Sequence, residues 1–180
     1  MINRKQQLSG PARPIVAFAL GFLSCALVFL AAEWRGARAE DPISVFGGQA
    51  VSNSLNDAHS TAWAVSQKVG HGRWTAEYGY LNEGHRDGTK RDGIFALVGT
   101  DHRLTPRLSS SFSAGPYLTA DTQATGPNTY RDVYGLALLA GFDLGVDLSP
   151  HWQTTLRWQH VMTFHDRDSD VFLIGIGFRP

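Results

Sequence analysis

Residues 168–178 read Asp-Ser-Asp-Val-Phe-Leu-Ile-Gly-Ile-Gly-Phe, and this stretch sets a pattern that the rest of the chain repeats. Every second residue from Phe172 to Phe178 is large and apolar, and two of the three positions between them are glycine. Successive side chains of a β-strand point to opposite faces, so a period of two indicates a strand with two unlike faces. The stretch therefore predicts a strand with one apolar face and one face of small residues.

The same alternation recurs after residue 40. It marks eight segments: 43–52, 60–69, 74–82, 93–101, 108–118, 132–142, 151–163 and 168–178. Their lengths centre on the roughly 9–11 residues that a tilted strand needs to cross a bilayer. The longest connections, 82–92 and 119–131, fit the long outer loops of outer-membrane barrels. We therefore predict an all-β fold, an eight-stranded antiparallel transmembrane β-barrel of the outer-membrane type.

The apolar faces are predicted to meet lipid, because the opposite faces are too small and crowded for a solvated surface and suit a narrow lumen. Aromatic residues stand near strand ends, as in the aromatic girdles of membrane barrels: Trp74, Tyr80, Tyr134, Trp152 and Phe178. The final strand also resembles the C-terminal signal by which the barrel-assembly machinery recognises outer-membrane proteins, although Arg179 and Pro180 follow Phe178. A soluble eight-stranded barrel of the lipocalin kind is the alternative.

Residues 1–39 differ in kind from residues 40–180. They carry five basic residues and one acidic residue, and an apolar run at 15–32 precedes Ala37-Arg-Ala39. This order is typical of a secretory signal peptide, so we predict cleavage after Ala39 and a barrel at 40–180. An uncleaved membrane anchor is the alternative. The whole chain has zero net charge and one cysteine, which argues against nucleic-acid binding and against a disulfide framework.

The lumen of an eight-stranded barrel is just wide enough for side chains to fill it. Lys68, Glu77 and Arg157 fall on the inward parity of their strands. Buried charges persist only when they are paired or hydrogen-bonded. We therefore predict a lumen network of Glu77 with Arg157 or Lys68, which would block a general porin channel.

The last hairpin places one polar pair on the lipid-side face. If the chain turns about His165, then His160 lies opposite Asp170 near the outer end of the barrel. A carboxylate that accepts a hydrogen bond from histidine fixes its tautomer and raises its basicity, as a general base requires. The pair is therefore a candidate for either a structural contact or a catalytic one.

Three features carry a family resemblance over roughly residues 74–178: the Tyr80-Leu-Asn-Glu-Gly84 stretch, the Ser113-Ala-Gly115 stretch and the final hairpin. With them the chain resembles the outer-membrane lipid A 3-O-deacylases of the PagL type. The resemblance implies an eight-stranded barrel whose outer surface carries a Ser–His–acid triad that removes an acyl chain from lipid A. It assigns His160 as the catalytic histidine and Asp170 as the acid.

The nucleophile of that family does not match. Met162 stands where the His-x-Ser motif has serine, and a thioether cannot attack an ester. Thr163 and Ser169 are the hydroxyls nearby, but both fall on the opposite face by parity. Two hypotheses follow. The first is a barrel that interacts with membrane lipid or lipopolysaccharide without catalysis. The second is a carboxylic-ester hydrolase acting on lipid A that uses His160, Asp170 and one of these hydroxyls.

The connection at 82–92 contains a basic group. Arg86, Lys90 and Arg91 could bind lipopolysaccharide phosphates, for which the arginine fork is well shaped, or could simply be solvated. Acidic residues alternate at 166–170 but lack the later glycine and glutamate of a calcium loop. The seven histidines lack metal-ligand spacing, so neither a metal nor a cofactor is predicted.

Overall fold

The structure is a computed structural model that describes residues 42–53, 58–71, 73–86, 89–126, 129–163 and 167–180. The predicted signal peptide at 1–39 lies outside the described residues. Within them there is no helix long and apolar enough to cross a membrane.

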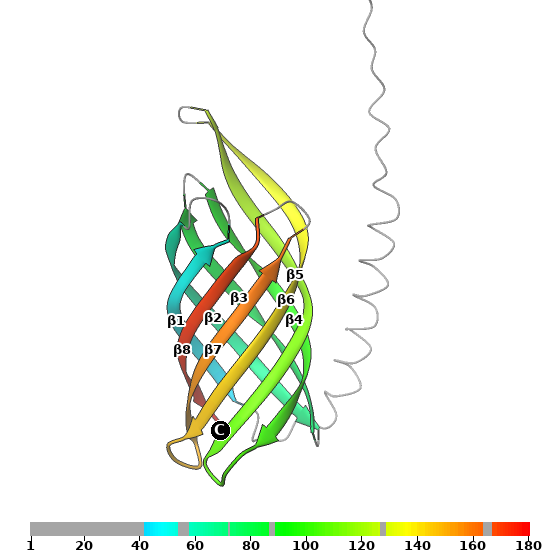
Figure 1. Ribbon diagram of the computed structural model, residues 1–180, viewed down its shortest axis with the longest axis vertical. Coiled ribbons are helices and arrows are strands. Elements are labelled where there is room, and N and C mark those ends of the chain that lie inside the picture. Colours follow the sequence, from blue (N-terminus) through cyan, green and yellow to red (C-terminus); the bar gives the residue numbers. More distant parts are fainter. Residues whose placement is uncertain (1–41, 54–57, 72, 87–88, 127–128, 164–166) are drawn as a thin grey trace, which may run out of the picture. The chain divides into compact units, whose positions relative to one another are not determined.

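The described residues form eight antiparallel strands that close into a barrel (Figure 1). The strands are β1 (Ile43–Ser52), β2 (His59–His71), β3 (Trp74–Arg86), β4 (Thr89–Arg103), β5 (Leu108–Gly126), β6 (Thr129–Asp147), β7 (Trp152–Met162) and β8 (Ser169–Phe178). Each strand pairs with its neighbours in sequence, and β8 pairs with β1 from Ser52↔Ser169 to Ile43↔Phe178. The predicted fold class is confirmed. We call the end of the barrel that holds the turns at 104–107 and 148–151 the turn end, and the opposite end the hairpin end.

The barrel is inverted relative to a soluble protein. On β8, the side chains of Phe172, Ile174 and Ile176 are 49–60% exposed, whereas Val171 and Leu173 are buried inside. The same exposure of large apolar side chains is found on the outer faces of the other strands. In water this surface would be unfavourable, but it matches the lipid-facing band of a transmembrane barrel. The predicted direction of the two faces is confirmed.

The interior contains charged residues toward both ends and apolar residues between them. Along β4, for example, Phe95 and Leu97 lie between Arg91 and Asp101. The buried apolar residues are Phe46, Ala50, Ala62, Ala64, Leu81, Phe95, Leu97, Tyr117, Ala137, Leu139, Val161, Val171 and Leu173. The charged groups therefore form two separate clusters, one near each end of the barrel.

Two hairpins extend further than the sequence predicted. The β3–β4 ladder continues to Arg86↔Thr89 and the β5–β6 ladder to Gly126↔Thr129, so most of the predicted loops at 82–92 and 119–131 are strand. Gly84 has a φ of +80° and lies where the β3–β4 register shifts. A Cβ there would come within 2.2 Å of the Thr61 carbonyl oxygen, so only glycine fits this close approach. What resembled a glycine-containing loop is a bulge. At the turn end, β6 likewise runs to Asp147, beyond the end of the predicted segment 132–142.

Candidate functional site

His160 and Asp170 meet on the outer surface of the barrel. The β7–β8 register pairs them directly, and His160 Nδ1 lies 2.9 Å from Asp170 Oδ1. They occupy the hairpin end of their strands, and their side chains are 27% and 24% exposed. The predicted pairing of these two residues is confirmed.

Two further side chains converge on the same carboxylate. Trp158 Nε1 donates to Asp170 Oδ1 over 2.9 Å, and Asn53 Nδ2 donates to Oδ2 over 2.8 Å. Trp158 could have been found from the sequence, because it lies two residues before His160 and shares its face. Asn53 could not, because it reaches Asp170 only where β1 closes the barrel against β8. We call Asn53, Trp158, His160 and Asp170 the outer carboxylate cluster.

The contacts within this cluster define which nitrogen of the His160 ring carries the proton that points to Asp170. An ionised carboxylate only accepts hydrogen bonds, so Nδ1 carries the proton that points to Asp170. When the ring is neutral, Nε2 is the hydrogen-bond acceptor, and no residue in the described part of the chain donates to it. The arrangement could accept a proton or hydrogen bond from a hydroxyl group outside the protein.

The two nearby hydroxyls are engaged elsewhere. Thr163 Oγ1 donates to Asp168 Oδ1 over 3.1 Å and accepts the Arg167 backbone N–H over 3.0 Å. Ser169 is fully buried in the lumen and donates to Glu83 Oε2 over 2.5 Å. The structure therefore does not bring Thr163 or Ser169 to His160, in keeping with their opposite parity along the strands.

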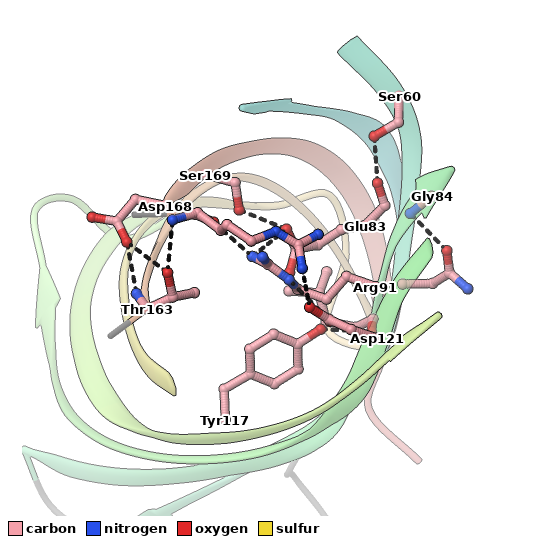
Figure 2. Close-up of polar contacts among 12 residues, drawn as sticks. Ser60, Glu83, Gly84, Arg91, Tyr117, Asp121, Thr163, Asp168 and Ser169 are labelled. Atoms are coloured by element: carbon pink, nitrogen blue, oxygen red, sulfur yellow. Dashed lines mark hydrogen bonds and ion pairs between the residues drawn. The ribbon is translucent and has the colours of Figure 1, made fainter. Parts of the chain in front are cut away.

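Arg91 lies in a strand and faces the lumen, not in an exposed loop as the sequence suggested, and its role in binding lipopolysaccharide phosphates stays a prediction. It is 4% exposed and lies in the lumen, on the same face of β4 as Phe95. Figure 2 shows it between the carboxylates of Glu83 and Asp121, 3.5 and 3.2 Å away. Arg167 Nη1 contacts the second Asp121 oxygen at 2.8 Å. We call Glu83, Arg91, Asp121, Arg167 and Ser169 the inner rim cluster.

The other two basic residues of the predicted phosphate-binding group differ from Arg91. Lys90 is exposed and makes a 3.3 Å ion pair with Asp92, which also accepts a hydrogen bond from the Tyr80 hydroxyl. The backbone of Arg86 pairs with Thr89, and its side chain lies outside the described residues. Of this group, Lys90 is the cation that the structure places at the surface.

The predicted lumen network lies toward the turn end. Arg157 Nη1 is 2.7 Å from Glu77 Oε1, and Nη2 is 2.7 Å from Asp143 Oδ2. Lys68 completes the network at 3.6 Å from Asp143, and the Phe46 ring lies 4.2 Å from the Arg157 guanidinium carbon. These residues line a polar cavity of about 440 Å³. The predicted pairing of Glu77 with Arg157 is confirmed. The described residues contain no group of side chains that could hold a metal ion.

No family model and no curated protein matches the chain. Several solved barrels are similar in fold. The attachment invasion locus protein Ail of Yersinia pestis is 12% identical over 77% of this chain and 97% of its own, with a TM-score of 0.60. Neisserial surface protein A is 15% identical over 81% and 99%, also with a TM-score of 0.60. The N-terminal barrel domain of OprF from Pseudomonas aeruginosa is 11% identical over 76% and 96%, with a TM-score of 0.59.

These likenesses show the fold, that of the small eight-stranded outer-membrane barrels. Together with the apolar outer face, the fold places the barrel in a bacterial outer membrane. The resemblance to lipid A deacylases is not among these findings and stays a prediction.

Proposed function

We propose that this outer-membrane barrel binds a lipid of the outer leaflet on its outer surface and does not cleave it. Lipopolysaccharide is the first lipid to test. The outer carboxylate cluster is the observation that carries the proposal. It combines a carboxylate, an imidazole and an indole at the hairpin end of a surface that carries many large apolar side chains.

A charged side chain on a lipid-facing surface is unfavourable unless other groups pair with it or donate hydrogen bonds to it. A carboxylate in that position therefore calls for an explanation. The carboxylate of Asp170 accepts hydrogen bonds from three donors, which lowers the cost of placing its charge there. Its side chain is still about a quarter exposed. The cluster borders apolar Phe172, which is 53% exposed. A lipid could therefore place an acyl chain along the apolar face while a hydroxyl of its head group donates to His160 Nε2. Lys90, on the opposite side of the barrel, is a second surface group that could contact a phosphate.

The absence of cleavage is proposed from the positions of the hydroxyls. Ester hydrolysis by a His–Asp pair needs a nucleophile within hydrogen-bond reach of the histidine. In the described part of the chain, Thr163 and Ser169 are both bonded to other acids, and Met162 follows His160 on the same face. This supports binding without cleavage, because no hydroxyl among the described residues is hydrogen-bonded to His160.

The second candidate function is lipid A acyl-ester hydrolysis. The 2.9 Å bond between His160 and Asp170 favours it, because this is the support that a general base receives in a catalytic triad. It requires a hydroxyl, such as that of Thr163, to leave its present partner when substrate binds.

Two measurements separate these functions. Lipid A is compared by mass spectrometry between cells with and without the protein, and the purified barrel is titrated with lipopolysaccharide in detergent micelles. We expect identical lipid A masses, and saturable binding that His160→Ala and Asp170→Asn both weaken. Asp132→Asn is the matched control, because it removes an outward carboxylate of β6 that is hydrogen-bonded to Thr122.

Loss of one acyl chain in cells with the wild-type protein, abolished by His160→Ala, would establish the hydrolase instead. If the wild-type barrel does not bind, or if Asp170→Asn and Asp132→Asn behave alike, the outer carboxylate cluster is not a lipid site.

A further inference from the structure

The β5–β6 hairpin is longer than the barrel needs. Both strands have 19 residues, against 10 or 11 for β1, β7 and β8. They stay paired from Leu108↔Val146 to Gly126↔Thr129, and Figure 1 shows the hairpin rising beyond the ends of the neighbouring strands. The ladder therefore continues past the closed part of the barrel, on the side where outer-membrane barrels extend into the medium.

The two outer edges of this hairpin are covered unequally. On the β5 side, β4 pairs as far as Thr89↔Gln123, which leaves three residues of β5 beyond the pairing. On the β6 side, pairing with β7 stops at Leu138↔Met162. In the part of the chain that the structure describes, no strand pairs with that side of β6 above Leu138. We call residues 130–137 of β6 the open edge.

The open edge has few of the features that protect exposed strand edges. Natural edges are blocked by proline, lysine, bulges or short length, because unpaired backbone groups are a template for another strand. Residues 130–137 read Tyr-Arg-Asp-Val-Tyr-Gly-Leu-Ala, with neither proline nor lysine. Tyr130 and Tyr134 are 62% and 81% exposed. Arg131 is exposed, and no described acid forms an ion pair with it.

We propose that the open edge binds an extended segment of another protein outside the cell, which adds to β6 as an antiparallel strand. Such a segment would continue the β6–β7 ladder beyond Leu138↔Met162, where no described strand pairs with β6. Main-chain hydrogen bonds would supply affinity and alternate side chains specificity. The side chains predict the partner's chemistry: aromatic or β-branched residues beside Tyr130 and Tyr134, and a carboxylate beside Arg131.

A second copy of the chain fits the open edge poorly as a binding partner. Two barrels in one membrane would be related by a two-fold axis along the membrane normal, and each β6 is tilted from that axis. With the strand tilt of about 35–45° that is usual for such barrels, the two copies of β6 would cross at roughly 70–90°. Neighbouring strands in a sheet are rotated by only about 20–25°. The geometry therefore favours a different protein.

The test uses the full barrel in detergent micelles and a short synthetic peptide of alternating valine and threonine with one glutamate. The peptide is N-methylated at alternate residues, so that one edge can pair and it cannot stack on itself. A fully N-methylated peptide is the control. Amide hydrogen exchange is measured by NMR. We expect exchange to slow by about tenfold or more at alternate residues of 130–137, with the fully methylated peptide inactive.

Arg131→Glu provides a second readout that does not depend on folding, because the side chain is exposed. This variant should bind the glutamate peptide several-fold more weakly and a lysine peptide more tightly. Protection outside 130–137, equal protection by the fully methylated peptide or an unchanged charge preference would each overturn the proposal. A cross-linked dimer joined through β6 would also overturn it.

Discussion

Ser169 and Asp170 are neighbours on β8, yet they belong to two regions with different roles. In both regions, hydrogen-bond donors surround a carboxylate. Ser169 lies in the inner rim cluster, where Glu83 and Arg91 have side-chain exposures of 0% and 4%. Asp170 lies in the outer carboxylate cluster, whose acid and histidine are about a quarter exposed. Each region satisfies a carboxylate with several donors. The carboxylate of the inner region is buried among its donors and links β3, β4 and β8, whereas the outer region remains accessible from the membrane.

The largest effect is expected at the turn end, where removal of Arg157 from the other charged cluster of the lumen tests whether buried ion pairs hold the strands together. Arg157→Met leaves Glu77 and Asp143 buried without their shared cation, and loss of one partner of a buried pair costs about 3–5 kcal/mol. The free energy of unfolding is measured in lipid vesicles with urea. Adding Glu77→Gln and Asp143→Asn should restore a large part of the loss. If Arg157→Met is neutral, the interior is more hydrated than the structure implies.

A charge introduced on the outer face tests whether that face meets hydrocarbon. Ile174 lies at the middle of the outward residues of β8, so Ile174→Arg should cost about 2–4 kcal/mol in a bilayer. Ile43→Arg is the control at the turn end, where the expected cost is about 0–1 kcal/mol. Unfolding in vesicles of both variants gives the difference. Equal costs would mean that the apolar band does not follow the membrane.

Ser169→Ala tests the inner member of the neighbouring pair. The substitution removes the hydroxyl that donates to the buried Glu83 carboxylate, and a lost donor to a buried acceptor costs about 1–3 kcal/mol. Urea unfolding measures the loss, and lipopolysaccharide binding should not change. A drop in binding would show that the two regions are coupled.

Asp170→Asn should have the smallest effect on stability. In contrast to Ser169→Ala, it should change lipopolysaccharide binding more than the free energy of unfolding. A partly exposed polar contact of this kind contributes about 0–1 kcal/mol, so unfolding should shift little. Lipopolysaccharide binding should weaken, because the asparagine no longer holds His160 in a single tautomer. A large loss of stability with unchanged binding would show that the outer carboxylate cluster is structural. Its role would then not differ from that of Ser169.

Much of this arrangement could be predicted from alternation alone. The pairing of His160 with Asp170 needed only a hairpin centre and a period of two, and the same parity placed Glu77 and Arg157 in the lumen. Arg91 was misplaced because residues 82–92 were interpreted as a loop, in which parity has no meaning. Extending the alternation of Phe95 and Leu97 back along β4 would have turned Arg91 inward.

The extended hairpins were missed for a related reason. Polar side chains and glycines are typical of loops, but they are equally suited to a ladder that leaves the membrane and is no longer required to be apolar on one face. Nothing local distinguishes these cases. The length of β6 beyond β7 becomes visible only when both strands are registered against their neighbours.

The order of residues along the chain establishes eight alternating segments and the separation of apolar from small and charged faces, because side-chain direction in a strand is a local property. Closure of the barrel was needed for the rest. It brings Asn53 of the first strand's end to Asp170 of the last strand and aligns Ser169 with Glu83. Among the described residues it also ends the pairing of β6 with β7 at Leu138. These contacts join residues 86 to 117 positions apart or depend on where a neighbouring strand stops, and no local pattern encodes either.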